Sequence, residues 1–290
     1  MGKILGIGEV LWDIFPNGKY LGGAPVNFVY HCRQMGLDAY PVSRVGSDEL
    51  GTELLGEMTT KGIPTDFIQI DPDHPSGTVR VEMTGEKHRF IIMEPAAWDF
   101  IEGDDKVMSA VRRAEAVCFG TLGQRNTASQ SAIMAMLYEC QGLVVFDINL
   151  RQKFFSREVI EDSLEFSHVL KLNDDEIMVI KELLGLSGQG IAEIAREILG
   201  EYGLDLVCVT RGAQGAILVS EKRVVEQPGT AVGIADTVGC GDAVTAVLVH
   251  GLVCKKELEV IARDACRVGE FVAGQAGATP VWTEELRKTI

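Results

Sequence analysis

The sequence lacks several patterns that mark common classes of protein. Its seven cysteines contain no Cys-x-x-Cys pair and its five histidines show no metalloenzyme spacing, so no zinc or redox-thiol site is expected. No Gly-x-x-x-x-Gly-Lys-[Ser/Thr] loop occurs, which excludes a Walker-type phosphate site. Positive charge is scarce, because 27 Lys and Arg face 42 Asp and Glu for a formal net charge of −15. We therefore expect neither nucleic acid nor an anionic membrane as a partner.

Long apolar runs are also missing. No stretch is long enough to cross a bilayer, and residues 1–4 lead into a predicted strand without the architecture of a signal peptide. Most cysteines sit in apolar runs, which is typical of buried reduced thiols rather than disulfides. From these features we expect a cytoplasmic protein. His31, on a helical face, is interpreted as packed or solvated rather than catalytic.

Short β-type runs alternate with helical patterns along the chain. This alternation predicts an α/β fold with a mostly parallel central sheet and helices on both faces. Ligands of such sheets bind beyond the carboxyl ends of the strands. Asp13, Asp147, Asn149, Asn173 and Thr210 follow predicted strands, so we expect them to share that edge. The strand candidates are 4–10, 116–120, 143–147, 168–172 and 206–210, and the helix candidates are 127–140, 174–184 and 191–202.

Two stretches break this alternation. Residues 11–21 carry β-type residues around Asn17-Gly18, a turn signal, and two further strands are predicted at 78–83 and 89–93. Together, residues of about 11–21 and 72–97 predict a small β-sheet that stands off a single domain spanning 1–290. This sheet is interpreted either as a lid over the site or as an edge extension or dimer surface.

Residues 236–244 carry the strongest chemical signal. Gly239 and Gly241 flank Cys240, and Asp242 follows where an apolar helical pattern begins. Glycines can turn several N–H groups in one direction, and a helix N-terminus adds unpaired donors, so this segment favours a phosphate. An acid beside a phosphate is unfavourable for binding alone, which suggests a general base for an attacking hydroxyl. The alternative is a loop in which Asp242 merely caps the helix.

A second glycine pair, Gly22 and Gly23, precedes a helical pattern with Pro25 at an early position, which predicts a strand-to-helix start. The glycines would permit close approach of a ligand. Asn27 offers both a donor and an acceptor to sugar hydroxyls, and Asp13 could accept from two vicinal hydroxyls. Taken alone, Asn27 could equally be a residue of the helix surface.

Three further features follow predicted strands, and each has a purely structural alternative. Asn173 and Glu176 could hold the water shell of a Mg²⁺ ion, or could simply cap the helix that starts there. Arg151 could contact the transferred phosphoryl group or a substrate oxygen, or could lie on the surface. Residues 210–215 are explained by a hairpin and could also contact nucleotide phosphates.

The segments Gly-Gly-Ala-Pro-Val-Asn at 22–27 and Asp-Thr-Val-Gly-Cys-Gly-Asp at 236–242 resemble the two signatures of the ribokinase-like sugar kinases, the PfkB family. Residues 8–13, 23–25 and 147–151 most resemble its fructokinase branch, and the similarity runs in order from about 4 to 280. The resemblance implies a single α/β kinase domain with a β lid, with ATP and Mg²⁺ as cosubstrates. It also implies a monovalent cation in many members and frequently a homodimer, here through the lid.

The resemblance also implies roles for individual residues by matching position. Asp242 would be the catalytic base. Asn173 and Glu176 would hold Mg²⁺ through water. The anion hole would be formed by Gly239, Cys240 and Gly241; the sugar contacts would be Asp13, Gly23, Asn27 and Arg151; and the nucleotide side would comprise Asn173, Glu176, Thr210, Gly212 and Gly215.

The chain departs from the family pattern at three positions. Cys240 stands where alanine is usual and Val244 where phenylalanine is usual. Cys240 still supplies its backbone N–H, and a thiol at a helix N-terminus is predicted to be acidified and reactive. Cys266 stands where many members carry an asparagine near the adenine, so the resemblance does not carry the usual purine contacts over to this chain.

These features predict ATP-dependent phosphorylation of a primary hydroxyl of a small sugar, with fructose as the first acceptor. Asp13 favours a neutral polyol over a sugar acid. The alternatives are a kinase for 2-keto-3-deoxygluconate, another sugar acid or a nucleoside. A non-catalytic sugar- or nucleotide-binding protein that kept the scaffold is the alternative from another class, and the retained Asp242 and glycines argue against it.

Overall fold

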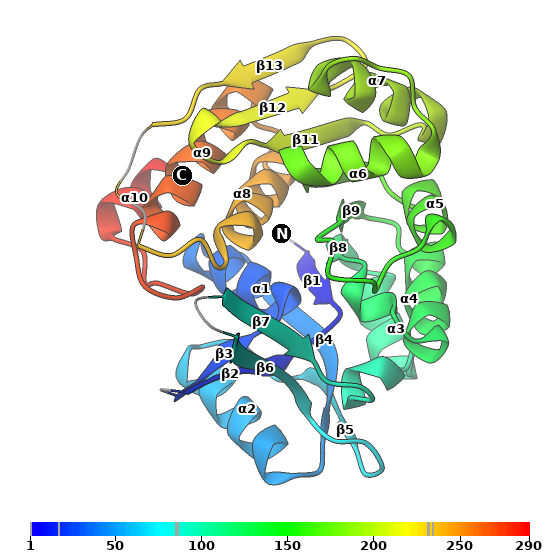
Figure 1. Ribbon diagram of the computed structural model, residues 1–290, viewed down its shortest axis with the longest axis vertical. Coiled ribbons are helices and arrows are strands. Elements are labelled where there is room, and N and C mark those ends of the chain that lie inside the picture. Colours follow the sequence, from blue (N-terminus) through cyan, green and yellow to red (C-terminus); the bar gives the residue numbers. More distant parts are fainter. Residues whose placement is uncertain (1, 17, 85–86, 231–232, 234) are drawn as a thin grey trace.

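The computed structural model describes residues 2–16, 18–84, 87–230, 233 and 235–290. Its centre is a nine-stranded, mostly parallel sheet (Figure 1), which confirms the predicted α/β class. In spatial order the strands are β13 (Val224–Gln227), β12 (Ala216–Val219), β11 (Leu206–Thr210), β10 (Val169–Asn173), β9 (Leu143–Asp147), β8 (Ala114–Phe119), β1 (Lys3–Ile7), β4 (Ala39–Gly46) and β5 (Phe67–Asp71).

The strands from β11 to β5 run parallel, whereas β12 and β13 are antiparallel additions at one edge. The parallel strands are apolar because helices cover both faces of the sheet. In β10, for example, Val169 is 1% exposed and Leu170 and Leu172 are 0% exposed. Burying each such side chain contributes about 1.5–3 kcal/mol, which fixes the strands in the interior.

Helices form a layer on each face of the main sheet (Figure 1). Among the described residues, none of these helices combines the length and the apolar character needed to cross a membrane. One face carries α1 (Ala24–Gln34), α2 (Glu49–Thr60), α8 (Cys240–Val253) and α9 (Leu258–Ala273), with α10 (Glu284–Thr289) packed on α8 and α9; the other carries α3 (Asp105–Val111), α4 (Thr127–Glu139), α5 (Arg157–Glu165), α6 (Asp174–Leu184) and α7 (Ile191–Tyr202).

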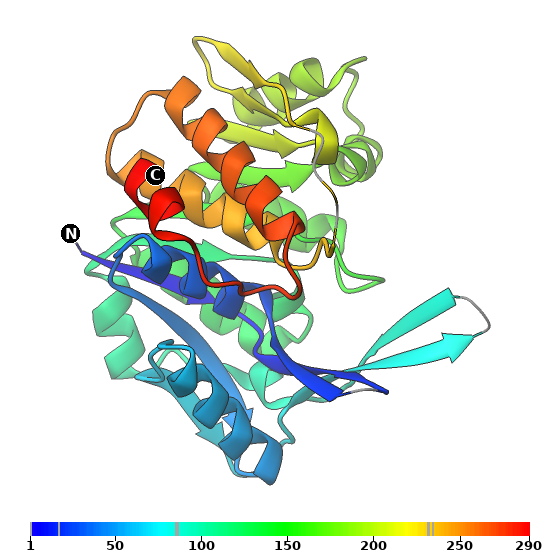
Figure 2. The ribbon, with the colours of Figure 1, turned by 90° about the vertical axis from the view of Figure 1, so that its left-hand side faces the viewer.

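A four-stranded sheet, here called the small sheet, projects away from this layered body (Figure 2). It contains, in order, β3 (Gly18–Gly22), β2 (Leu11–Phe15), β6 (Gly77–Thr84) and β7 (Lys87–Ile92). The two predicted insertions therefore do form one sheet, joined by the parallel pairing of β2 with β6. The turn residue predicted at Asn17 and those predicted at 85–86 lie outside the described residues.

The order in which the chain adds strands to the main sheet changes side at β1: β4 and β5 extend the sheet on one side of β1, and β8 to β13 extend it on the other. A crevice at the carboxyl ends of the strands is expected at such a point. Asp147, Asn173 and Thr210 are the last residues of β9, β10 and β11 and lie at this edge. Asp13 does not follow a strand of the main sheet, contrary to prediction, because it lies inside β2 of the small sheet.

Candidate active site

The glycine-rich segment forms the start of α8. Gly239 is the N-cap residue, with a φ of 78° that favours glycine, and no side chain caps the first turn. A Cβ atom at Gly239 would lie 2.6 Å from the carbonyl oxygen of Ala278, and one at Gly241 would lie 2.8 Å from Lys171 Nζ. The first N–H groups of a helix have no partner within it and form the positive end of its dipole. The Cys240 N–H makes only a long bond, of 3.4 Å, to the Thr237 carbonyl oxygen, so the segment offers backbone donors to an anion.

Asp242 lies in the first turn of α8 and is partly buried. Asn27 Nδ2 donates a hydrogen bond of 2.9 Å to Asp242 Oδ2, so the amide holds one carboxylate oxygen. Burial, followed by the negative charge of Asp147, raises the pKa of Asp242 to about 6, against the opposing effects of Asn27, Lys171 and Arg151. A carboxylate with this pKa is ionised at neutral pH and is a better proton acceptor than an unperturbed aspartate.

A buried ion pair lies beneath this turn. Lys171 Nζ donates to both oxygens of Asp147 at 3.0 and 3.2 Å, and Thr245 Oγ1 donates to Asp147 Oδ2 at 2.6 Å. Burial disfavours the charged lysine, but the attraction of Asp147, Glu176 and Asp242 outweighs it and raises the pKa of Lys171. Lys171 is thus a fixed positive charge beside Gly241, although Asp147 largely neutralises it.

Asp13 on β2 lies against Gly22, shortly before the start of α1. Burial raises the pKa of Asp13 to about 6, and the charge of Arg151 opposes this shift. The charge of Arg151, an exposed side chain, also opposes the raised pKa values of Glu9 and Asp242, so its guanidinium group lies within electrostatic range of all three acids. Among the described residues, the buried Asn27 Oδ1 has no hydrogen-bond partner, which leaves an acceptor for a hydroxyl group.

Close packing surrounds Gly23, the N-cap residue of α1. Its φ is 112°, and a Cβ atom there would lie 2.4 Å from the carbonyl oxygen of Glu9, so only glycine fits. A small cavity of about 20 Å³ lies beside this contact, and Glu9, Asn149 and Asp242 are among the residues that line it. The structure therefore brings Asp13, Gly23, Asn27, Arg151 and Asp242 into one region.

Asn173 and Glu176 form a reciprocal cap at the start of α6. Asn173 Oδ1 accepts from the Glu176 backbone N–H at 2.8 Å, and Glu176 Oε2 accepts from the Asn173 backbone N–H at 2.8 Å. Glu176 Oε1 accepts from the Leu150 backbone N–H at 2.9 Å. Because both carboxylate oxygens are engaged, a Mg²⁺ ion here would keep its water shell, as Mg²⁺ commonly does. No cluster of three or more His, Cys, Asp or Glu in the described ranges could hold a metal directly.

Thr210 lies next to Asn173, because these residues are partners in the β10–β11 register. The chain then makes a short turn at Gly212–Gln214 and returns as β12, which confirms the predicted hairpin. Gly212 is exposed, with a φ of 53°. Gly215 is buried, and a Cβ atom there would lie 2.0 Å from the carbonyl oxygen of Gln227, so its packing requires glycine.

The prediction of an acidified Cys240 thiol is wrong. Partial burial, followed by the charges of Asp236 and Asp242, raises the pKa of Cys240 to about 11. These effects outweigh the N-terminal position in α8. Cys266 lies close to Ala216 and Arg211, which places it beside the turn between β11 and β12, and burial raises its pKa to about 11. All seven cysteines are free thiols, as predicted.

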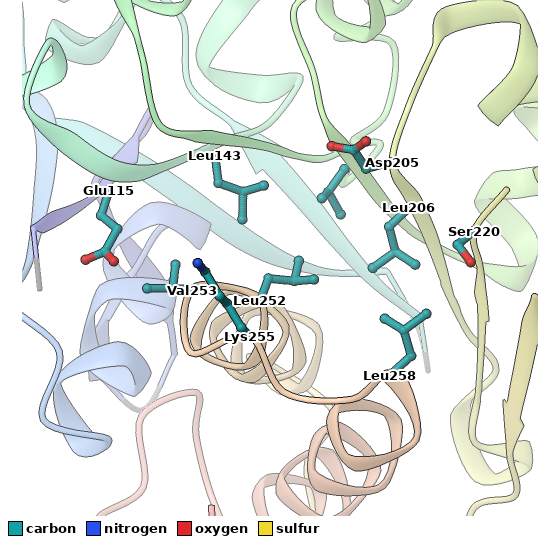
Figure 3. Close-up of a pocket in the computed structure, with 10 residues that line it drawn as sticks. Glu115, Leu143, Asp205, Leu206, Ser220, Leu252, Val253, Lys255 and Leu258 are labelled. Atoms are coloured by element: carbon teal, nitrogen blue, oxygen red, sulfur yellow. The ribbon is translucent and has the colours of Figure 1, made fainter. Parts of the chain in front are cut away.

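A larger cavity of about 320 Å³ lies at the opposite edge of the sheet. Figure 3 shows Leu143, Leu206, Leu252 and Lys255 among its lining residues. Leu143 and Leu206 are the first residues of β9 and β11, so this cavity faces the amino ends of the strands. None of the predicted site residues lines it, and we do not assign the active site to it.

Three residues of the site were not predicted from the sequence: Glu9, Lys171 and Thr245. Lys171 carries a usable signal, because a lysine inside an apolar strand is rarely buried without a charged partner. Glu9 and Thr245 carry none, since their contacts depend on the three-dimensional fold.

His31 is buried, which agrees with the interpretation of a packed rather than a solvated side chain. Its Nδ1 accepts from Trp282 Nε1 at 3.0 Å and its Nε2 lies 2.9 Å from the Ala278 carbonyl oxygen.

Comparison with known proteins gives a consistent picture. The model of the pfkB family carbohydrate kinases matches residues 13–285. The chain is 27% identical to a protein named as a sugar kinase from Pyrococcus horikoshii, over 93% of this chain and 87% of that protein. It is also 27% identical to a fructokinase from Escherichia coli, over 86% of this chain and 84% of that protein.

The fold is shared with solved kinase structures. A fructokinase from Xylella fastidiosa with bound ATP superposes with a TM-score of 0.86 at 20% identity, covering 99% of this chain and 97% of that chain. The superposition confirms the ribokinase-like architecture expected from the two glycine-containing segments.

Proposed function

Because the chain belongs to the pfkB family of carbohydrate kinases, and is therefore an ATP-dependent sugar kinase, we propose that it phosphorylates a primary hydroxyl of a small neutral sugar, with fructose as the first candidate. The observation that carries this proposal is the surplus of carboxylates on the acceptor side. Glu9 and Asp242 line one small cavity there, and the charge of Arg151 acts on both of these acids and on Asp13.

The charge balance favours a neutral acceptor over a sugar acid. Lys171 adds little attraction for a substrate carboxylate, because Asp147 already pairs with it. A carboxylate at 4 Å from one of the acids would be repelled by about 4 kcal/mol at an effective dielectric constant of 20. Hydroxyl groups, in contrast, can donate to the acids and to the free Asn27 Oδ1.

In the proposed reaction Asp242 accepts the proton of the acceptor hydroxyl. The hydroxyl oxygen then forms a bond to the terminal phosphorus of ATP as the bond to the ADP oxygen breaks. The backbone N–H groups of residues 239–241, at the positive end of α8, hold the negative charge of the transferred group. General-base assistance of this kind is worth about 10²–10⁴-fold in rate.

ADP release across a panel of acceptors tests the proposed substrate class. The panel contains fructose, other neutral sugars, 2-keto-3-deoxygluconate and other sugar acids, and nucleosides, each with Mg-ATP. The proposal expects kcat/KM for the best neutral sugar to exceed that of every sugar acid by at least about tenfold, equivalent to 1.4 kcal/mol. A sugar acid or a nucleoside as the best acceptor would overturn it.

The nucleotide side is proposed to comprise Asn173, Glu176, Thr210, Gly212 and Gly215. Mg²⁺ accompanying ATP would be held through water by the cap of α6, and would neutralise charge on the phosphates. Asn173→Ala is expected to raise the concentration of Mg²⁺ needed for half-maximal rate, and an unchanged requirement would contradict this assignment.

A monovalent cation is proposed as an activator, so replacing potassium by tetramethylammonium should lower kcat; equal rates would argue against it.

The small sheet is proposed to act as a lid and as the surface of a homodimer. Tyr20 on β3 is 53% exposed, although it is a large aromatic side chain. Sedimentation velocity of the wild type and of Tyr20→Glu tests the dimer. A wild-type monomer at micromolar concentration, or a dimer that Tyr20→Glu leaves intact, would count against this surface.

A further inference from the structure

Glu9 is a buried carboxyl group in the lining of the site, and the proton and phosphoryl transfers proposed above give it no step. It is 5% exposed and follows Gly8, whose φ of 144° turns the chain away from β1. This turn explains why β1 ends at Ile7 rather than at the predicted residue 10. The Glu9 side chain lines the same small cavity as Asp242. Acidic side chains are rarely buried to this degree without a specific partner.

The partner of Glu9 is the first turn of α1. Glu9 Oε1 accepts from the Ala24 backbone N–H at 3.0 Å. The N-cap residue Gly23 has no side chain to supply this bond, and Pro25 has no N–H to satisfy. The N–H groups of Val26 and Asn27 both donate to the Gly23 carbonyl oxygen at 3.1 Å. Ala24 therefore carries the one donor of this turn that needs an outside acceptor, and Glu9 supplies it.

Asn27 connects this turn to the proposed base. It lies within the same first turns of α1, and its Nδ2 donates to Asp242 Oδ2 at 2.9 Å. The contact leaves Asn27 Oδ1 buried without a partner in the described part of the chain. A small shift of the start of α1 would therefore lengthen the Asn27–Asp242 bond and turn the carboxylate of Asp242.

We propose that Glu9 is a positioning residue for phosphoryl transfer: its carboxylate anchors the first turn of α1, through which Asn27 holds Asp242 in the orientation that accepts the hydroxyl proton. This inference rests on the proposed role of Asp242 as the base. It adds a requirement that the base alone does not impose, namely that the cap of α1 remains charged and in place.

The electrostatic surroundings give this role a measurable signature. Burial raises the pKa of Glu9 to about 7, backbone N–H donors oppose the shift, the charge of Asp242 adds to it and Arg151 opposes it. A protonated carboxyl is a weaker acceptor than a carboxylate, so the cap of α1 weakens as Glu9 gains a proton. The charged and titratable groups around it are Cys118 from β8 and Asp147 from β9, which line the same cavity, Arg151 from the loop after β9, and Asp242 from α8.

The test compares Glu9→Gln and Glu9→Ala with the wild type, using kcat, the KM values for both substrates and the pH profile between 5 and 9. Glu9→Ala removes the cap, and we expect kcat at pH 8 to fall by about 10–100-fold, the scale of a misplaced catalytic group. The KM for ATP should stay within twofold. Glu9→Gln keeps an acceptor oxygen but carries no charge and does not titrate, so its kcat at pH 8 should lie between those of Glu9→Ala and the wild type. As the pH is lowered, the fall in kcat of Glu9→Gln should reflect the protonation of one group fewer than in the wild type.

Glu197 provides a matched control. Its carboxylate, on α7, also accepts from backbone N–H groups, those of Ser187 at 2.8 Å and Gly188 at 3.2 Å, and neither of these partners is a residue of the site. Glu197→Ala and Glu197→Gln should leave kcat and its pH profile unchanged. Asp242→Asn, measured in parallel, tests the role of Asp242 as the base, so that a failure of the positioning role of Glu9 can be told apart from a failure of the base.

Three results would overturn the inference. If Glu9→Ala keeps kcat within twofold while Asp242→Asn is strongly impaired, the base stands and the positioning role fails. If Glu9→Ala does not fold, Glu9→Gln still tests the inference. A fall in its kcat at low pH that reflects as many protonating groups as in the wild type excludes the positioning role. Wild-type turnover of Asp242→Asn would instead remove the base itself, and the inference with it.

Discussion

Replacing Lys171 by methionine should destabilise the protein strongly, because it removes one partner of a buried ion pair. Lys171 and Asp147 are each 6% exposed, and Nζ lies 3.0 and 3.2 Å from the two carboxylate oxygens. Methionine fills a similar volume but leaves Asp147 charged, with the Thr245 hydroxyl as its remaining donor among the contacts described. Breaking a buried pair in this way costs about 3–5 kcal/mol, a large part of a typical stability of about 5–15 kcal/mol.

The loss should depend on pH in a defined direction. Without Lys171, the buried carboxylate of Asp147 has lost its countercharge, and burial then disfavours its charged form. An acid whose pKa is raised on folding contributes stability below its unfolded pKa and loses that contribution as the pH rises through the folded pKa. The free energy of unfolding of Lys171→Met should therefore lie closer to that of the wild type at pH 5.5 than at pH 8.

Urea unfolding of four proteins measures this effect: the wild type, Lys171→Met, Asp147→Asn and the double variant. We expect Lys171→Met to lose at least about 3 kcal/mol at pH 8, and Asp147→Asn to restore most of that loss in the double variant, because the stranded charge is then gone. A loss below about 1 kcal/mol, or a double variant no more stable than Lys171→Met, would refute the argument for a strongly coupled buried pair.

Three further predictions concern the start of α8. Turnover should fall as the pH drops through about 6, because Asp242 gains a proton there; initial rates between pH 5 and 8 that do not change would contradict this. Gly241→Ala would place a Cβ atom 2.8 Å from Lys171 Nζ, so kcat should fall at least about tenfold while the fold persists by circular dichroism, and full activity would contradict the close fit. Cys240 should react slowly with iodoacetamide at pH 7.5, because the pKa of its thiol is raised to about 11; rapid labelling would show that the thiol is acidified after all. Cys240→Ala should stay active, because the proposed anion hole uses only the backbone N–H of residue 240.

Local sequence patterns predicted those parts of the fold whose causes are local. The strands at 143–147 and 206–210 and the helices at 174–184 and 191–202 match β9, β11, α6 and α7 residue for residue. Each is an apolar run or an amphipathic period, and α6 and α7 also end at glycines in the left-handed conformation. The hairpin after Thr210 followed from its glycines in the same way.

Features that depend on distant contacts could not be predicted in this way. The first strand was predicted to continue to residue 10, but it ends earlier because the Glu9 side chain turns back to cap α1. Asp13 was assigned to the edge of the main sheet because nothing in its neighbourhood shows that it pairs within a second sheet. The acidity of Cys240 was misjudged because a helix N-terminus is visible in the sequence, whereas its burial beside Asp236 and Asp242 is not.

The central claim is that Asp242 is the base at the start of α8, and Asp242→Asn tests it most directly. Asparagine keeps the size of the side chain and can still contact Asn27, but it cannot accept the hydroxyl proton. Steady-state kcat with the best acceptor should fall by at least about 10²-fold, while the melting temperature and the affinity for Mg-ATP stay close to those of the wild type. Turnover near the wild-type rate would remove Asp242 from the mechanism.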